Sequence, residues 1–271
     1  MKAKSVFLVF AILALTITGC QTPQATPPPT SEPVAVEPPT NVPPPTEPPP
    51  PTETPVPTNT PLPTETPKPT NTALPEGTLF RDDFNEELQP GWTWQNENPS
   101  NWTITDDGWL QIVGEDNFIL DGGENLQKNM LWREVPSGDY VITVHIVTKP
   151  NTDFQQTAIY FYENSENFIV INRGFCDHCG GNGIYMDYRI QGAIGNYKLL
   201  TEATDIYLRL EIVGDVISGF YALQPDQWER LGRFGNYFDF KQVGLGVSNV
   251  DPFGKDSDVV GLYDYFEITL P

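Results

Sequence analysis

The sequence predicts an all-β fold, a two-layer β-sandwich, for residues 76–271. Aromatic and β-branched residues occur there in short runs separated by Gly, Asn and Asp, which is the pattern of strands and turns. No segment repeats its apolar residues with the helical period. The roughly 190 residues contain no internal linker, and this length is sufficient for one sandwich core.

The candidate strands follow one another along this domain. We place them at 102–105, 110–113, 129–134, 139–147, 157–162, 167–172, 183–190, 206–213, 216–222, 242–248 and 262–270. Within 140–147, apolar residues occupy both odd-numbered and even-numbered positions, which point to opposite faces of a strand. This pattern predicts a strand buried on both faces. In 206–212, apolar and polar residues alternate, which predicts one buried face and one solvent-facing side.

The start of the chain has the pattern of an export signal. Two lysines precede an uncharged apolar run at 6–17, which is too short to span a bilayer permanently. The run ends on Ile17-Thr18-Gly19-Cys20, which resembles the lipobox of bacterial lipoproteins. The resemblance implies that 1–19 is a signal peptide and that Cys20 carries acyl chains such as palmitate, stable membrane anchors when combined. The alternative is an ordinary signal peptide with a chance cysteine.

Residues 20–75 form a Pro/Thr-rich tether between this anchor and the sandwich. They hold almost no large apolar side chain, so we expect them to be disordered or extended. Their second half repeats Pro-Thr-Glu/Asn-Thr-Pro every six residues, which favours polyproline II geometry. At ~3.1 Å per residue, such a tether reaches on the order of 150 Å. The expected location is therefore extracytoplasmic, lipid-anchored to the cell membrane or outer membrane and facing the cell surface.

The net charge argues against nucleic acid as a partner. The chain carries 36 acidic and 15 basic residues, a formal charge of −21, and no basic stripe. Neutralising phosphates requires such a stripe. Two histidines also leave few candidates for a general base.

Several motifs, taken in order, resemble one known family. They are Asp82-Asp83-Phe84-Asn85, Trp92-Thr93-Trp94, Trp102-Thr103-Ile104, Gly108-Trp109-Leu110-Gln111-Ile112, the segments 158–164, 167–170 and 207–211, Gly219-Phe220-Tyr221, Trp228, and the segments 243–247 and 263–267. Together they cover nearly all of 79–270 and resemble the concanavalin A-like domain at the C-terminus of bacterial β-xylosidases and its stand-alone relatives. The resemblance implies a jelly-roll β-sandwich and, by analogy, contact with glycans.

Aromatic residues supply candidates for sugar binding, because pyranose rings stack on exposed aromatic faces. Tyr160 and Tyr162 share one face of a strand, so we expect them to line a concave surface. The alternative is that these two rings belong to the core. The further candidates, on a neighbouring strand and the opening loop, are Tyr188, Arg189, Trp94 and Asn96. We expect the rings of Trp102, Trp109 and Trp228 to be core instead.

Carboxylates do not form a glycosidase motif in the sequence. The glucanases that resemble this fold use Glu-x-Asp-x-x-Glu on one strand, and that spacing is missing. Glu163 and Glu166 flank Asn164-Ser165, which is typical of a turn. A non-catalytic carbohydrate-binding or adhesion domain is the favoured function. A hydrolase whose carboxylates come from separate strands and a structural surface protein are the alternatives.

Domains of this superfamily often join their first and last strands through a structural Ca²⁺. The resemblance implies that Asp82 or Asp83 meets Asp264 at such an ion, with backbone carbonyls completing the six to eight oxygens that calcium requires. The alternative is that Asp82 and Asp83 only begin a strand.

Cys176 and Cys179 lie in a Gly-rich loop. An even pair outside the cytoplasm favours a disulfide. Free thiols and a metal site with His178 are the alternatives, and zinc would need His145 as a fourth ligand. The sequence around this pair lacks the strand–helix unit that normally houses the redox-active cysteines of thioredoxins.

Overall fold

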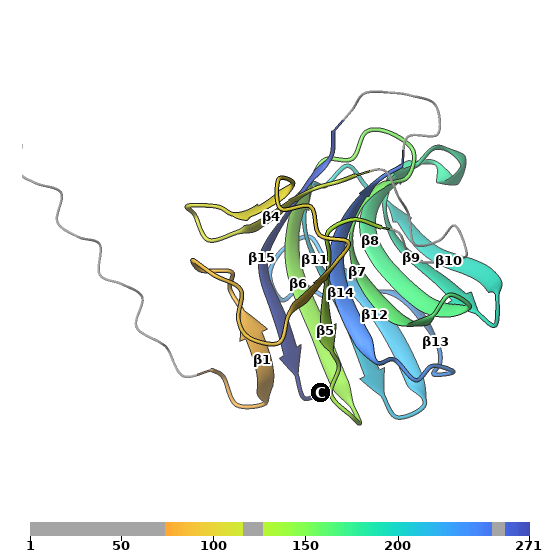
Figure 1. Ribbon diagram of the computed structural model, residues 1–271. Coiled ribbons are helices and arrows are strands. Elements are labelled where there is room, and N and C mark those ends of the chain that lie inside the picture. The colour runs from red at the N-terminus through yellow and green to blue at the C-terminus, as the bar shows by residue number, and fades with distance from the viewer. Residues whose placement is uncertain (1–73, 116–126, 251–257) are drawn as a thin grey trace, which may run out of the picture. The chain divides into compact units, whose positions relative to one another are not determined.

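A computed structural model describes residues 74–115, 127–250 and 258–271, and they form two antiparallel sheets packed face to face (Figure 1). This is the predicted all-β sandwich. The expected signal peptide, Cys20 and almost all of the tether lie outside the described residues. In the ranges that the structure describes, no helix is both long enough and apolar enough to cross a membrane.

Sheet A has the order β13-β12-β11-β6-β15-β4-β3, and β1 pairs with β15. Its strands are β1 (Thr78–Asp82), β3 (Trp102–Ile104), β4 (Leu110–Val113), β6 (Tyr140–Thr148), β11 (Asp205–Val213), β12 (Val216–Ala222), β13 (Glu229–Gly235) and β15 (Val260–Thr269). Sheet B has the order β10-β9-β8-β7-β14-β5-β2. Its strands are β2 (Thr93–Gln95), β5 (Met130–Glu134), β7 (Gln155–Asn164), β8 (Asn167–Cys176), β9 (Gly181–Ile190), β10 (Ala193–Leu200) and β14 (Gln242–Asn249).

Every predicted strand is present, and β4 and β12 have the predicted bounds. The structure adds β1, β2, β10 and β13, which the sequence pattern does not predict. Each of these four pairs with a single neighbouring strand. An edge strand buries less of its surface, so its sequence needs no strict apolar alternation.

The core lies between the inner faces of the two sheets. Strand β6 illustrates how the sequence builds it, because Ile142, Val144 and Ile146 point inward and are completely buried. On the outer face of the same strand, Thr143 and His145 are only 4% and 8% exposed. The prediction that this strand is buried on both faces is therefore confirmed. Its outer face is covered around His145 by the rings of Trp109, Tyr207 and Tyr265.

Tyr263 connects the sheets across the core. It lies on β15, and its hydroxyl is 2.9 Å from the carbonyl oxygen of Ala158 on β7 and 2.8 Å from that of Gly246 on β14. Burial raises the pKa of this phenol well above its ordinary value, so it stays a hydrogen-bond donor. This contact fixes β7 and β14 at the point where their other side carries Tyr160.

Candidate functional site

The outer face of sheet B, the side turned away from sheet A, carries its own cluster of large side chains. Its members are Met130, Trp132, Ala158, Tyr160, Phe168 and Val170, with Tyr162 packed against them. Ile159 and Phe161 point instead into the core between the sheets. The prediction that Tyr160 and Tyr162 share one face is confirmed.

Tyr160 is nevertheless completely buried, so the expectation that its ring lines an exposed surface is wrong. Its hydroxyl lies 3.0 Å from the Gln127 amide nitrogen, 3.2 Å from that of Gln156 and 3.2 Å from Ser248 Oγ. Burial raises the pKa of Tyr160. The segment at Gln127, which is distant in sequence, therefore packs against Tyr160 and helps to bury this predicted ligand residue. Asn96 supports that segment, because its Nδ2 donates to the Gln127 carbonyl oxygen at 3.2 Å.

Beside Tyr160, an aromatic band crosses the outer face of sheet B. We define this aromatic band as Trp132, Tyr162, Phe168 and Arg189. The Trp132 and Tyr162 ring centroids are 5.9 Å apart, those of Tyr162 and Phe168 are 6.5 Å apart, and the Arg189 guanidinium lies 5.6 Å from the Phe168 centroid. Tyr162 and Arg189 remain partly exposed. Burial raises the pKa of Tyr162, so its hydroxyl is neutral and able to donate a hydrogen bond.

A cavity of about 490 Å³ adjoins the Trp132 end of the aromatic band. Its lining residues are Gly91, Thr93, Gln95, Trp132, Arg133, Glu134 and Gln242. Gln95 Oε1 accepts the indole N–H of Trp132 at 2.7 Å and so fixes this ring. Gly244, on the neighbouring β14, makes room for it, since a Cβ there would lie 2.5 Å from the indole. The cavity thus combines one ring with amide, carboxylate and guanidinium groups.

A smaller pocket of about 150 Å³ lies at the other end of the face, between β7, β8 and β9. Its lining residues are Phe154, Gln155, Gln156, Asn172, Gly174, Phe175, Cys176, Cys179, Tyr185 and Asp187. Burial raises the pKa of Asp187 to about 6, although the Asn172 amide donates to its carboxylate at 2.9 Å and acts in the opposite direction. Among the groups on this face whose pKa is shifted by the protein, Asp187 therefore titrates closest to neutral pH.

Asp187 and Glu134 do not form a glycosidase pair. They lie on β9 and β5, four strand steps apart in sheet B. At about 4.8 Å per step their separation is about 19 Å, whereas the paired carboxylates of glycosidases lie about 5 to 9.5 Å apart. Glu163 and Glu166 lie at the β7–β8 turn, as predicted, and Glu163 Oε2 accepts the Asp239 amide.

Two predicted ligand residues lie on the inner side of sheet B. Trp94 packs against the core with its ring centroid 4.6 Å from that of Trp102, and Tyr188 packs 5.0 Å from Phe234. The expectation that they reach the same surface as Tyr162 is wrong, because the parity of β2 and β9 points them inward. Three further residues of this face, Trp132, Phe168 and Asp187, were not predicted. The alternation within their strands is the signal that places them beside Tyr162.

The three carboxylates expected at calcium already have other partners. Asp82 is buried and accepts the amides of Phe84 and Gln89 and the Trp92 indole N–H at 2.8–2.9 Å. Asp83 pairs with Arg81, and Asp264 pairs with His145. In the described part of the chain, no three His, Cys, Asp or Glu side chains form a metal-binding group. The arrangement of Asp82, Asp83 and Asp264 around one ion is therefore not found, and calcium binding stays a prediction.

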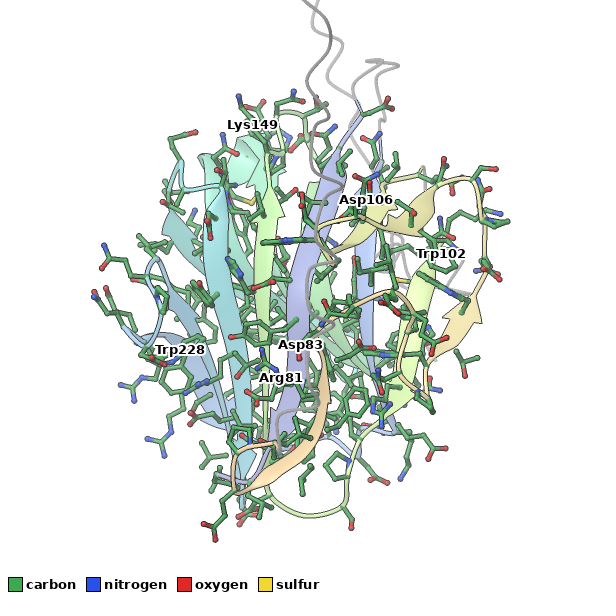
Figure 2. The ribbon with its side chains drawn as sticks, turned by 90° about the vertical axis from the view of Figure 1, so that its left-hand side faces the viewer. Arg81, Asp83, Trp102, Asp106, Lys149 and Trp228 are labelled. Atoms are coloured by element: carbon green, nitrogen blue, oxygen red, sulfur yellow. A yellow bond between two sulfur atoms is a disulfide. The ribbon has the colours of Figure 1, made fainter. Side chains whose placement is uncertain are left out.

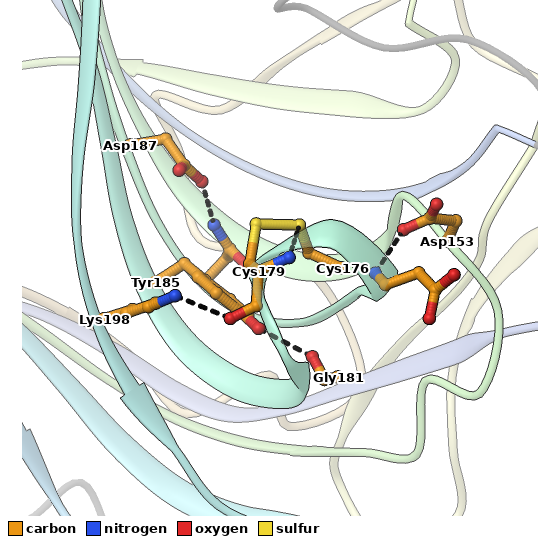
Figure 3. Close-up of a disulfide and its surroundings, with 9 residues drawn as sticks. Asp153, Cys176, Cys179, Gly181, Tyr185, Asp187 and Lys198 are labelled. Carbon is orange, nitrogen blue, oxygen red and sulfur yellow. Dashed lines mark hydrogen bonds between the residues drawn. A yellow bond between two sulfur atoms is a disulfide. The ribbon is translucent and has the colours of Figure 1, made fainter.

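Cys176 and Cys179 form a disulfide, as predicted, so the free-thiol and metal alternatives are wrong for this pair (Figure 3). It spans the short 3₁₀ helix Asp177–Cys179, which contains no buried residue. Figure 3 shows Asp187 and Tyr185 beside it, from the neighbouring strand β9.

The three tryptophans expected in the core lie in different parts of the sandwich. Trp102 packs against the core cluster. Trp109 and Trp228 lie instead on the outer face of sheet A, where Trp109 contacts His145 and the Arg209 guanidinium lies 3.9 Å from the Trp228 ring. Figure 2 views this face and shows Trp228 at its side. Both rings are partly exposed, so the expectation of core burial is wrong for them.

Several solved structures share this fold at low sequence identity. BlXynB, a GH43 protein from Bacillus licheniformis, is 19% identical with a TM-score of 0.61, covering 70% of this chain and 39% of that one. A xylan β-1,4-xylosidase from Bacillus halodurans is 15% identical with a TM-score of 0.55, covering 76% and 41%. An uncharacterized protein from Mycobacterium paratuberculosis is 11% identical with a TM-score of 0.51, covering 70% and 99%.

The present chain thus spans well under half the length of the two proteins from Bacillus. No curated protein matches it in sequence. The family of β-xylosidase C-terminal concanavalin A-like domains matches residues 81–268. This chain therefore belongs to that family.

Proposed function

We propose that this chain is a surface lipoprotein that displays a non-catalytic glycan-binding sandwich. Cys20 anchors it to the membrane, and the Pro/Thr-rich tether holds the sandwich away from the lipid. The lipobox-like sequence and the uninterrupted tether support the anchor. The Cys176–Cys179 disulfide is consistent with export, because disulfides persist in oxidising compartments.

The aromatic band and the adjoining cavity carry the glycan-binding proposal. A sugar binds where an aromatic ring meets its C–H face and nearby amides and carboxylates accept its hydroxyl protons. Tyr162 offers a partly exposed ring. Gln95, Glu134 and Gln242 supply acceptors at the cavity next to it. Tyr160 lies beneath this site as a support and does not contact the ligand.

Family membership suggests the first ligand to test. A similar structure is that of a xylan β-1,4-xylosidase. Xylan is therefore our first candidate, and the −21 charge of the whole chain makes a neutral glycan a better match than an acidic one.

Binding to soluble xylan tests this proposal, measured by calorimetry on the full chain carrying Cys20→Ala so that it stays in solution. We expect Tyr162→Ala to weaken binding by up to about tenfold, because a stacked aromatic contact is worth about 0.5–1.5 kcal/mol. Tyr237→Ala is the matched control, since Tyr237 is 71% exposed and does not belong to the aromatic band. Equal losses in both variants, or no binding to xylan or any other polysaccharide, would contradict the proposal. Release of reducing sugar would instead favour a hydrolase.

The anchor has its own test. Cells fed a labelled fatty acid should incorporate the label into the wild-type chain and not into Cys20→Ser. The wild-type chain should then be protected from release by high salt, because acyl chains rather than charge hold it to the membrane. Label in the Cys20→Ser chain would overturn this assignment.

A further inference from the structure

The position of the Cys176–Cys179 disulfide is poorly suited to a purely stabilising role. The bond joins residues three apart, in the turn between β8 and β9. These strands already pair up to this turn, with Cys176 opposite Gly181. A cross-link restricts the unfolded chain least when it closes a very short loop. A chemical role therefore explains the position better than a structural one does.

The disulfide is also accessible to a ligand. Cys176 and Cys179 are both partly exposed. They form one side of the smaller pocket, together with the apolar side chains of Phe154 and Phe175. Since the helix between the cysteines buries nothing, opening the S–S bond exposes no part of the core. A molecule in this pocket touches the disulfide while the sandwich stays folded.

The surroundings of the disulfide favour thiolate chemistry. Cys176 Sγ accepts the backbone N–H of Cys179 at 3.2 Å, a contact that stabilises negative charge on this sulfur. The Lys198 ammonium lies 2.6 Å from the Cys179 carbonyl oxygen and brings a positive charge close to the pair (Figure 3). Asp187 lines the same pocket, and with a pKa of about 6 it exchanges protons readily near neutral pH.

We propose that Cys176–Cys179 is a redox-active disulfide that exchanges with a cysteine dithiol peptide bound in the smaller pocket. A thiolate of the peptide attacks Cys179 Sγ, the S–S bond breaks, and Cys176 Sγ leaves as the thiolate held by the Cys179 amide. The second peptide thiolate then attacks the peptide sulfur of this mixed disulfide and expels Cys179 Sγ. Two electrons pass from the peptide to the protein, the peptide becomes a disulfide, and its two protons end on Cys176 and Cys179.

This reaction does not require the thioredoxin fold. Exchange needs access to one sulfur and a stabilised leaving thiolate, and a nearby proton source lets the released thiolates become thiols. The pocket, the Cys179 amide and Asp187 provide these three features on a β-sheet. The same steps in reverse let the reduced protein open a disulfide in a peptide.

The first experiment measures whether the disulfide opens in the folded protein. The reference is the full chain with Cys20→Ala, in which Cys176 and Cys179 are the remaining cysteines. We expect dithiothreitol to reduce it fully, as counted by alkylation and mass spectrometry, with an unchanged circular dichroism spectrum. Reduction that proceeds only in step with unfolding would overturn the proposal.

The second experiment measures exchange. We expect the reference chain to accelerate the reduction of insulin by dithiothreitol by about tenfold over the Cys176→Ser/Cys179→Ser double variant. The Cys176→Ser single variant should form a mixed disulfide with a cysteine peptide through Cys179. Equal rates for the reference chain and the double variant would overturn the proposal.

Asp187→Asn tests the proton source. We expect slower exchange at pH 7 together with an unchanged or raised stability, a combination that damage to the fold would not produce. Asp226→Asn is the matched control, because Asp226 is exposed and lies outside the pocket. An unchanged exchange rate in Asp187→Asn would remove Asp187 from the mechanism.

Discussion

The outer faces of the two sheets carry similar side chains but use them differently. On sheet A, His145 lies 2.8 Å from Asp264 and 2.7 Å from Asp205, and its ring stacks on Tyr207 at 4.2 Å. Arg209 covers the Trp228 ring in the same way. On sheet B, the rings pack on one another into a buried cluster with a cavity at either end.

This difference shows that aromatic content alone does not mark a binding face. On sheet A, charged neighbours already occupy the ring faces, as when the Arg81 guanidinium lies 4.2 Å from the Tyr265 centroid. A sugar would have to displace those cations. On sheet B, the partly exposed Tyr162 ring lies beside Trp132, and Trp132 lines the larger cavity together with Gln95, Glu134 and Gln242. The proposed glycan site therefore follows from which ring stays partly exposed.

Replacing one tyrosine on each face should produce the largest contrast. Tyr160→Ala should lower the free energy of unfolding by about 3–5 kcal/mol, because it removes a completely buried ring. Tyr207→Ala on sheet A should cost only about 1 kcal/mol, since that ring is partly exposed. Urea denaturation of both variants measures the difference. Equal costs would mean that the two faces are packed alike.

The pH dependence of stability should separate the faces further. The pKa of Asp187 is about 6 in the folded protein against 3.8 for an ordinary aspartate. Between these values the folded state binds more protons than the unfolded state, so the free energy of unfolding falls as pH rises from about 4 to about 7. The contribution of Asp187 to this fall is about 1–3 kcal/mol.

Asp187→Asn should remove this contribution. The variant should lose less stability than the wild type between pH 4 and pH 7, and Asp226→Asn should follow the wild-type curve. Denaturation at several pH values measures both. A wild-type slope in Asp187→Asn would show that its carboxyl titrates normally in the folded state.

The smallest expected effect concerns the covered rings of sheet A. Arg209→Gln should lower the stability by about 0.5–1 kcal/mol, because it removes a cation from the face of Trp228. Arg230→Gln is the control, since Arg230 is exposed on the edge strand β13 and should change the stability by less than about 0.5 kcal/mol. Thermal unfolding measures both. Xylan binding by Arg209→Gln at Trp228 would support the idea that a cation on a ring face prevents a sugar from stacking there.

The strands and their inward and outward sides were predictable to a large extent. β4, β12 and the doubly buried β6 follow from short-range patterns, because successive side chains of a strand point to opposite faces. The edge strands β10 and β13 were missed, since a strand with one neighbour buries too little surface to impose an apolar pattern. The Cys176–Cys179 pair was predictable from cysteine number and spacing.

The sequence by itself determined the all-β class, the shared face of Tyr160 and Tyr162, and the disulfide, because each depends on residues near one another in the chain. Only the tertiary structure decided that Gln127 and Ser248 enclose Tyr160, that Trp132 joins Tyr162, and that the disulfide shares a pocket with Asp187. Exposure depends on which distant segments pack against a side chain, and strand alternation contains no information about those segments.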